Sequence, residues 1–254
     1  MISLDLLVRD GLLSAQELPA SYSDNYENQQ VDFQLVANIN EPLIRKAVHS
    51  LSQRSTSDTL KQEFERYCSR DDVQLWLNNA ALFNAISEIP DLRGKDWWDW
   101  PTELRTRDAA ALDAKRASST ASIDEFCATQ FLFDKQWLAI KKYANEKGGA
   151  RVGDMPSYVG GHSADVWANQ SLFLLNGECK PSAVAGVPPD AFSEDGQRLV
   201  GVPAKRQVSR SLTAGRHESR KHNFREQKAD RAPFRRPDRF ADRCDDRGAP
   251  AVAS

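Results

Sequence analysis

The side chains that could do chemistry gather in two loops of the second half of the sequence. The first loop follows the stretch ARVGDMPSYV and contains Asp154, a Gly-Gly pair and the polar, aromatic run SADVWAN. A carboxylate at the mouth of a strand, followed by such a loop, is typical of a binding or catalytic site. A lone Asp can also cap its own loop, so both roles stay open for Asp154. Asp165 is expected to cap the following turn or helix.

The second loop is GVPPDAFSEDGQ, over residues 186–197. Pro188 and Pro189 fix their φ angles and should stiffen it. Asp190, Phe192 and Gln197 then offer a carboxylate, an apolar ring and an amide. Because a Pro-Pro-Asp sequence by itself is usually a turn, the residues alone leave this loop as a turn or a binding element.

Helical segments must position these loops. The stretch LDLLVRDGLL predicts a short helix with Gly11 near a turn. In EPLIRKAVHSLSQR, Leu43, Ala47, Val48 and Leu51 recur with a period near 3.6 and predict one buried helix face.

The pattern then changes from helical to α/β. The stretch DTLKQEFERYCSRDDVQLWLNNAALFNAISEI continues the helical period, with Ser57 or Asp58 as N-cap. IDEFCATQFLFDKQWLAIKKYANEKG predicts a long amphipathic helix that ends near Gly148. ARVGDMPSYV predicts a short strand. Helix, tight turn, strand and functional loop form the repeating unit of a (β/α) barrel, whose site lies at the C-terminal ends of its strands.

The composition restricts the class of protein to which the chain can belong. The 254 residues are 40% apolar and 28% charged, which is typical of a soluble globular protein. No run of about 18 apolar residues predicts a membrane span, and the amphipathic, acid-containing N-terminus predicts neither a signal nor a transit peptide. The four cysteines lack CxxC spacing and predict free thiols rather than a zinc site or a disulfide framework. They are Cys68, Cys127, Cys179 and Cys244.

Charge and composition change near Gln197. Residues 198–254 carry 15 Lys and Arg against 7 Asp and Glu, whereas residues 1–197 carry 19 against 29. The segment after 197 has no Trp, Tyr, Ile or Met, so it should be disordered. An Arg-rich tail could also be an RNA-binding arm, but three aromatics and the lack of RGG or RS repeats disfavour that function.

Several blocks resemble the 4-α-glucanotransferases, also called amylomaltases or disproportionating enzymes. They are VDFQLVANINEPLIRKA, LWLNNAALFNAI, GKDWWDWPTELRTRD, QFLFDKQWLAIKKYANEKG, GDMPSYVGGHSADVWAN and GVPPDAFSEDGQ. GGHSADVWANQSLFLLN and PPDAFSE look most like the plant and algal branch. The resemblance runs from Met1 to about Gln197. It implies an incomplete (β/α)8 TIM-type barrel of fold class α/β, with a helix-rich insertion at about 30–122 and a barrel helix, strand and loop at about 123–197.

The resemblance also implies a chemistry. These enzymes move α-1,4-glucan segments between maltooligosaccharides by a retaining mechanism, with an Asp nucleophile, a Glu acid/base and a further Asp, and without cofactor or metal. Asp154 matches a strand-end acid near the sugar subsite. Asp190, Phe192 and Gln197 lie in a loop that folds over the glucan. These four residues are the predicted substrate-binding set.

Two further features each allow two interpretations. Trp97, Trp98 and Trp100 could form a sugar platform, but the resemblance puts them in the helical insertion and favours packing. His162 is as well explained as a surface-loop histidine as by a role in binding.

The family's nucleophile lies in an RIDHFRG motif, which this sequence does not contain. Asp238 falls near the expected distance, but its neighbours do not match. We therefore predict no catalytic residue in the chain and expect it to be inactive by itself. The codons for Leu199–Lys205, read one base later, permit Leu-Trp-Gly-Ser-Pro-Leu, the family's continuation. This indicates that residues 198–254 are an out-of-frame translation.

Two alternatives to the enzyme remain: a catalytically dead glucan-binding relative, or an RNA-binding protein acting through the basic tail. The favoured interpretation expects α-1,4-glucans as partners and neither membrane nor nucleic acid. It places the protein inside the cell, in the plastid stroma for a plant or algal source and in the cytoplasm for a bacterial one.

Overall fold

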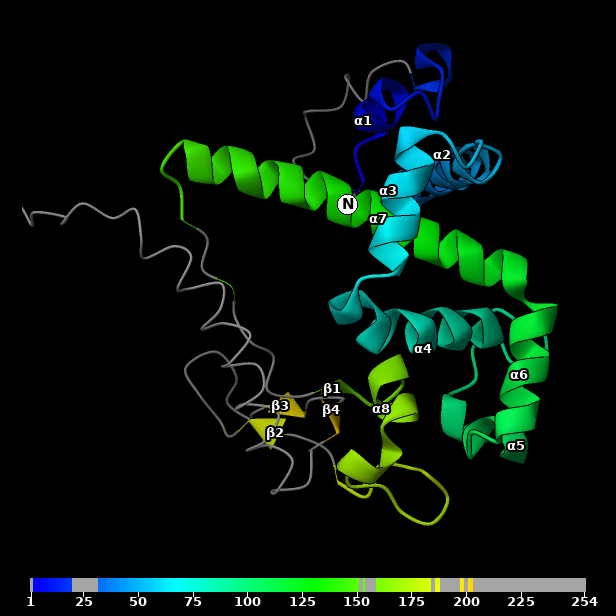
Figure 1. Ribbon diagram of the computed structural model, residues 1–254. Helices are drawn as coiled ribbons and strands as arrows, with labels where there is room; N and C mark the ends of the chain where they lie inside the picture. The colour runs from blue at the N-terminus through cyan, green and yellow to red at the C-terminus, as the bar shows by residue number, and fades with distance from the viewer. Residues whose placement is uncertain are drawn as a thin grey trace, which may run out of the picture. The chain divides into compact units, whose positions relative to one another are not determined.

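The structure, a computed structural model, describes residues 2–19, 32–150, 153, 159–183, 186–187, 197–198 and 201–202. This part of the chain is mostly helical (Figure 1). Its α-helices are α1 Leu4–Arg9, α2 Phe33–Ser52, α3 Thr59–Cys68, α4 Asp71–Ser87, α5 Thr102–Arg105, α6 Ala109–Ser118, α7 Thr120–Glu146 and α8 Ala164–Ala168. Three short 3-10 helices are η1 Ala15–Glu17, η2 Trp97–Asp99 and η3 Gln170–Leu172.

Local signals set several helix ends. The Asp58 carboxylate accepts hydrogen bonds from the backbone N–H groups of Leu60 and Lys61, so Asp58 is the N-cap of α3. Gly11 follows α1 with φ +68°, and Gly148 follows α7 with φ +78°. Such angles suit glycine, which has no Cβ. The single helical stretch predicted for residues 58–89 is instead two helices, α3 and α4.

A first core cluster lies between α1, α2, α3, α7 and the first half of α4. The predicted face of α2 is confirmed: Ala47, Val48 and Leu51 are buried, and Leu43 packs against the cluster. α7 packs against α2, α3 and α4, and Figure 1 shows it as the longest helix in the picture. Burial of these aliphatic faces supplies the main favourable term for this region.

A second core cluster lies at the other end of α4. The fully buried indoles of Trp97 and Trp167 pack there with Trp100, Leu82 and Ile86. α4 therefore contributes its first half to one cluster and its second half to the other. A helix used in this way carries apolar residues on more than one face.

The described strands are short and antiparallel. β1 Val159–Gly160 pairs with β4 Gly201–Val202, and β2 Gly186–Val187 pairs with β3 Gln197–Arg198. The parallel strands that a (β/α) barrel requires are not among the described residues, and most of the predicted strand ARVGDMPSYV lies outside them. The division at Gln197 stays a prediction, although Val202, beyond it, is buried in the second cluster.

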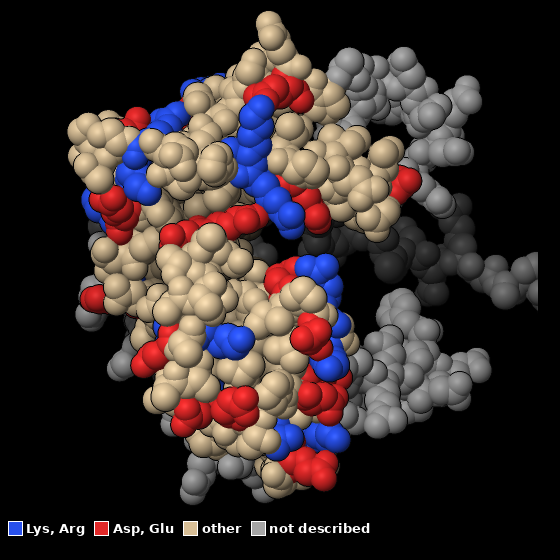
Figure 2. Space-filling view, turned by 90° about the vertical axis from the view of Figure 1, so that its right-hand side faces the viewer, with Lys and Arg blue, Asp and Glu red and all other residues tan. Residues whose placement is uncertain are grey.

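The surface of the described part is mixed in charge. Figure 2 shows a face on which Lys and Arg side chains lie among Asp and Glu side chains. Among the described residues, no helix combines the length and the apolar character needed to cross a membrane.

Candidate functional site

The predicted substrate-binding residues fall mostly outside the described residues. Asp154, Asp190 and Phe192 are among those not described, and for Gln197 the structure describes the backbone alone. Gln197 pairs with Val187, which brings the two ends of the GVPPDAFSEDGQ loop together. The structure therefore does not test whether these four side chains meet, and their binding role stays a prediction.

The other predicted loop, after β1, is firmly attached to the helical region. The Trp97 indole Nε1–H donates to the Gly161 carbonyl at 2.9 Å, and the Trp167 Nε1–H donates to the Leu104 carbonyl at 3.0 Å. Gly161 is closely packed, because a Cβ there would lie 3.2 Å from Val202 Cγ2, and that side chain would have to shift. The N–H group of each indole is therefore buried together with a hydrogen-bond acceptor.

The three tryptophans of the WWDW motif pack into the protein, which is the role that the resemblance favoured. Trp97 and Trp100 are buried and Trp98 is partly buried. His162 joins them: its Nδ1 accepts from the Trp97 backbone N–H at 3.1 Å, and its ring lies 5.2 Å from that of Phe83. These contacts make His162 part of the attachment between the loop and η2.

The prediction that Asp165 caps the following turn or helix is wrong. Ser163 is the N-cap of α8, since its side chain accepts from the Val166 backbone N–H. The Asp165 side chain stays exposed in the first turn of α8. It is thereby left available to line a pocket.

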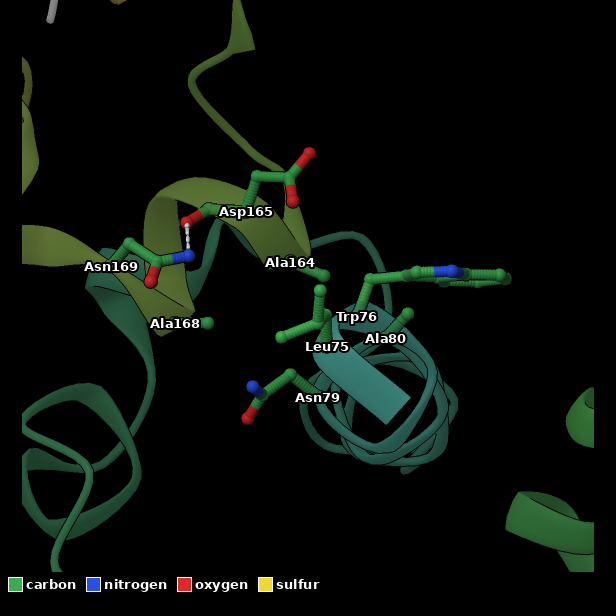
Figure 3. Close-up of a pocket in the computed structure, with 8 residues that line it drawn as sticks. All are labelled: Leu75, Trp76, Asn79, Ala80, Ala164, Asp165, Ala168 and Asn169. Carbon is green, nitrogen blue, oxygen red and sulfur yellow. Dashed lines mark hydrogen bonds between the residues drawn. The ribbon is translucent and has the colours of Figure 1, made fainter. Parts of the chain in front are cut away.

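That pocket lies between α4 and α8 and has a volume of about 210 Å³ (Figure 3). Small side chains leave the space, and one indole, two amides and one carboxylate surround it. The lining residues are Leu75, Trp76, Asn79, Ala80, Ala164, Asp165, Ala168 and Asn169.

The polar groups of the pocket are partly preset. The Asn79 Oδ1 accepts from Arg107 Nη2 at 2.9 Å, and the Asn169 amide donates to the Asp165 carbonyl at 3.0 Å. Asn79 therefore keeps its NH₂ group for donation, and Asn169 keeps an acceptor oxygen. In Figure 3 the Trp76 ring extends to one side of Leu75, while the two amides lie on the other. An apolar face beside donors and acceptors can bind a polyhydroxyl ring.

Arg107 links this pocket to the second core cluster. Its guanidinium lies over the Trp167 ring, 4.2 Å from the centroid, while it also holds Asn79. Burial lowers the pKa of Arg107, because it disfavours the charged form. Its φ of +62° is uncommon for a residue with a Cβ, and such strained positions cluster at functional sites.

Sequence periodicity does not reveal this pocket. Its two walls are separated by more than eighty positions in the chain, and the periodicity of α4 does not show what packs opposite. One signal was available: Trp76 lies beside Leu77 but off the buried face of α4, and its side chain is 38% exposed. An exposed Trp is uncommon enough to suggest a contact surface.

The comparisons with known proteins agree on one class. The structure matches that of "Amylomaltase from Streptococcus agalactiae in complex with acarbose" with a TM-score of 0.70 and 29% identity, over 83% of this chain and 41% of that one. The chain is 44% identical over 203 residues to the 4-alpha-glucanotransferase, chloroplastic/amyloplastic, of Solanum tuberosum, covering 80% of this chain and 34% of the relative.

A bacterial relative extends the match. The 4-alpha-glucanotransferase of Streptococcus pneumoniae serotype 4 is 36% identical over 197 residues, which is 77% of this chain and 37% of that protein. A sequence model of the family described as 4-alpha-glucanotransferase matches residues 1–204. The chain belongs to the 4-alpha-glucanotransferase family. It spans about a third of the length of these curated relatives.

Proposed function

We propose that residues 1–197 carry part of the glucan site of a 4-α-glucanotransferase, which moves α-1,4-glucan segments between maltooligosaccharides in starch or maltodextrin metabolism. The observation that carries the proposal is the family match over residues 1–204. The chemistry is a retaining displacement through a glycosyl-enzyme, and it involves neither metal nor cofactor. The names of the plant relatives favour the plastid stroma as its location.

Within that site, Asp154, Asp190, Phe192 and Gln197 contact the glucan. The paired ends of the GVPPDAFSEDGQ loop support this role for the last three, because they fix where the loop begins and ends. The pocket between α4 and α8 adds Trp76, whose exposed indole would stack on a glucose ring.

The 254-residue chain is inactive when it stands alone. A retaining mechanism needs a nucleophile and an acid/base, and the family's RIDHFRG motif is not in the sequence. The incomplete barrel, the insertion at about 30–122 and the out-of-frame origin of residues 198–254 belong to the same proposal.

A chimera tests the function. Residues 1–197 replace the matching segment of the Solanum tuberosum relative, and the product is incubated with maltotriose. The proposal expects glucose and longer maltodextrins at a rate within about tenfold of the unmodified relative. A folded chimera that leaves maltotriose unchanged contradicts it. If that chimera still binds maltoheptaose, the catalytically dead glucan-binding alternative takes its place.

Trp76→Ala in the chimera tests the pocket. The expected result is a KM for maltodextrins raised about 5- to 20-fold with kcat little changed, because a stacking contact binds substrate and transition state alike. Leu138→Ala is the matched control, since Leu138 is a 45% exposed apolar residue of α7 that does not line the pocket. Equal effects of both changes would remove Trp76 from the glucan site.

A further inference from the structure

Cys68 and Cys127 are far apart in sequence but meet between two helices of the first core cluster. Cys68 is the last residue of α3, and Cys127 lies in α7. The rings of Phe64 and Tyr67, on α3, lie 5.6 Å and 5.7 Å from the ring of Phe131, on α7.

Those ring contacts place α3 against α7. Cys127 is buried in the first core cluster, and Cys68 packs against that cluster. Their side chains hydrogen-bond to each other. Both cysteines are free thiols in the structure.

The two thiols are chemically unequal. The pKa of Cys68 is lowered, chiefly because its thiolate accepts a hydrogen bond from Cys127, with Lys61 acting in the same direction and Asp124 against it. The pKa of Cys127 is raised, because that hydrogen bond and burial both keep its proton in place. Cys68 is partly exposed and Cys127 is buried. Cys68 is therefore the thiol that reacts first.

Solvent reaches the neighbourhood of this pair. A pocket of about 420 Å³ opens between α2, α3 and α7, and Phe64 and Ala128 line it. Lys61 and Asp124, the two charged groups that act on Cys68, line it as well. Neither cysteine lines this pocket, so a small disulfide compound would reach Cys68 through the exposed part of its own side chain.

We propose that Cys68 and Cys127 form a thiol–disulfide exchange site that takes low-molecular-weight disulfides of the glutathione type. The Cys68 thiolate attacks one sulfur of the disulfide, forms a mixed disulfide and expels one thiolate, which takes up a proton. The Cys127 sulfur, as its proton leaves, then attacks the Cys68 sulfur and expels the second thiol. Two protein thiols are oxidised to one disulfide, and one disulfide is reduced to two small thiols.

The bond would join α3 to α7 without a large rearrangement. Thiols in hydrogen-bond contact must close to about 2.05 Å, which side-chain rotation and a small helix shift can supply. The bond would close a loop of about sixty residues and restrict the unfolded chain. The apparent Tm of the oxidised protein should rise on the order of 5–10 °C.

The test uses the full 254-residue chain in which Cys179 and Cys244 are replaced by Ser. The protein is incubated with oxidised glutathione, alkylated, digested and analysed by mass spectrometry. The expected product is one disulfide-linked pair of peptides containing Cys68 and Cys127, with loss of both free thiols and return of both after dithiothreitol. Two free thiols after treatment, or a product that stays glutathionylated at Cys68, overturns the proposal.

Single variants check the order of the steps. Cys127→Ser should stop at the mixed disulfide on Cys68, whereas Cys68→Ser should react at least tenfold more slowly at Cys127. Equal reactivity of the two variants contradicts the assigned order. Because peptide mapping of the parent protein gives its own answer, the proposal stays testable even if one of these variants fails to fold.

Discussion

The two core clusters are built in different ways. The first joins apolar faces of helices and includes residues that recur at helical spacing, such as Ala47 and Leu51. The second joins indoles to distant carbonyl groups: the bonds from Trp97 to Gly161 and from Trp167 to Leu104 connect positions 64 and 63 residues apart. The first cluster therefore stabilises helices, whereas the second holds a loop against them.

The difference has a functional meaning. Directional hydrogen bonds place a loop more narrowly than apolar burial does, because burial is not directional. The loop after β1 carries Asp165 and Asn169 to the α4–α8 pocket and begins just after the stretch that contains Asp154. We expect changes in the second cluster to affect the glucan site and changes in the first to affect stability alone.

The largest expected effect comes from Trp97→Ala. Removing a fully buried indole leaves a cavity and removes its hydrogen bond to the Gly161 carbonyl, so the free energy of unfolding should fall by about 3–5 kcal/mol. Urea denaturation followed by circular dichroism measures it. Trp98→Ala, at the partly buried neighbouring position, should cost less than half as much; equal losses would mean that the bond to Gly161 has no special weight.

A second prediction concerns the reacting subsite. In the chimera, Asp154→Ala should lower kcat/KM about 30- to 150-fold, because a charged hydrogen bond to a sugar hydroxyl is worth about 2–3 kcal/mol. Asp165→Ala should have a smaller effect, since its carboxylate lines the pocket between α4 and α8 and we do not assign it to the reacting subsite. Initial rates with maltotriose measure kcat/KM for both variants. Similar small effects at both positions would show that Asp154 does not contact the sugar at the reacting subsite.

Arg107 gives a paired prediction about strain. Arg107→Ala loses the contact with Trp167 and the bond to Asn79, and it should cost about 1–2 kcal/mol of unfolding free energy. Arg107→Gly loses the same contacts but relieves the +62° φ angle, so it should be the less destabilising change. If urea denaturation shows that the Gly variant is the less stable of the two, the positive φ angle at this position does not strain the folded backbone.

The smallest predicted effect is a pH dependence in the first cluster. The pKa of Asp58 is lowered from 3.8, first by the hydrogen bond from the Lys61 backbone N–H. A lowered folded-state pKa gives stability that is present above the unfolded value and is lost as pH falls through the folded value. Below about pH 4 the urea midpoint should therefore drop more for the parent than for Asp58→Asn, which keeps the cap but cannot titrate. Parallel pH curves would contradict this assignment.

Local features of the first cluster were readable from the sequence, whereas the long-range partners in both clusters were not. The α2 face, the Asp58 cap and the Gly148 end depend on neighbours within a turn or two, so local periodicity predicts them. The partners of Trp97 and Trp167 lie more than sixty residues away, and only tertiary structure brings them together. The same reason hid the pocket between Trp76 and Asn169 and the pair formed by Cys68 and Cys127.

The break between α3 and α4 was also missed. Residues 58–89 keep a helical period throughout, and neither Gly nor Pro marks the turn at Ser69 and Arg70. The sequence also does not show that the two halves of α4 belong to different core clusters. A window of sequence shows that a helix is apolar but not what each half contacts.

Amide hydrogen exchange tests the central claim most directly, namely that the second cluster, and not the first, holds the loop after β1. In the parent chain the Val166 and Trp167 amides, which donate to the Ser163 side chain and backbone, should exchange slowly. Trp97→Ala should speed their exchange at least a hundredfold while α2 amides change little, and Leu51→Ala should do the reverse. Loop amides that exchange freely in the parent, or that respond equally to both substitutions, would contradict the account.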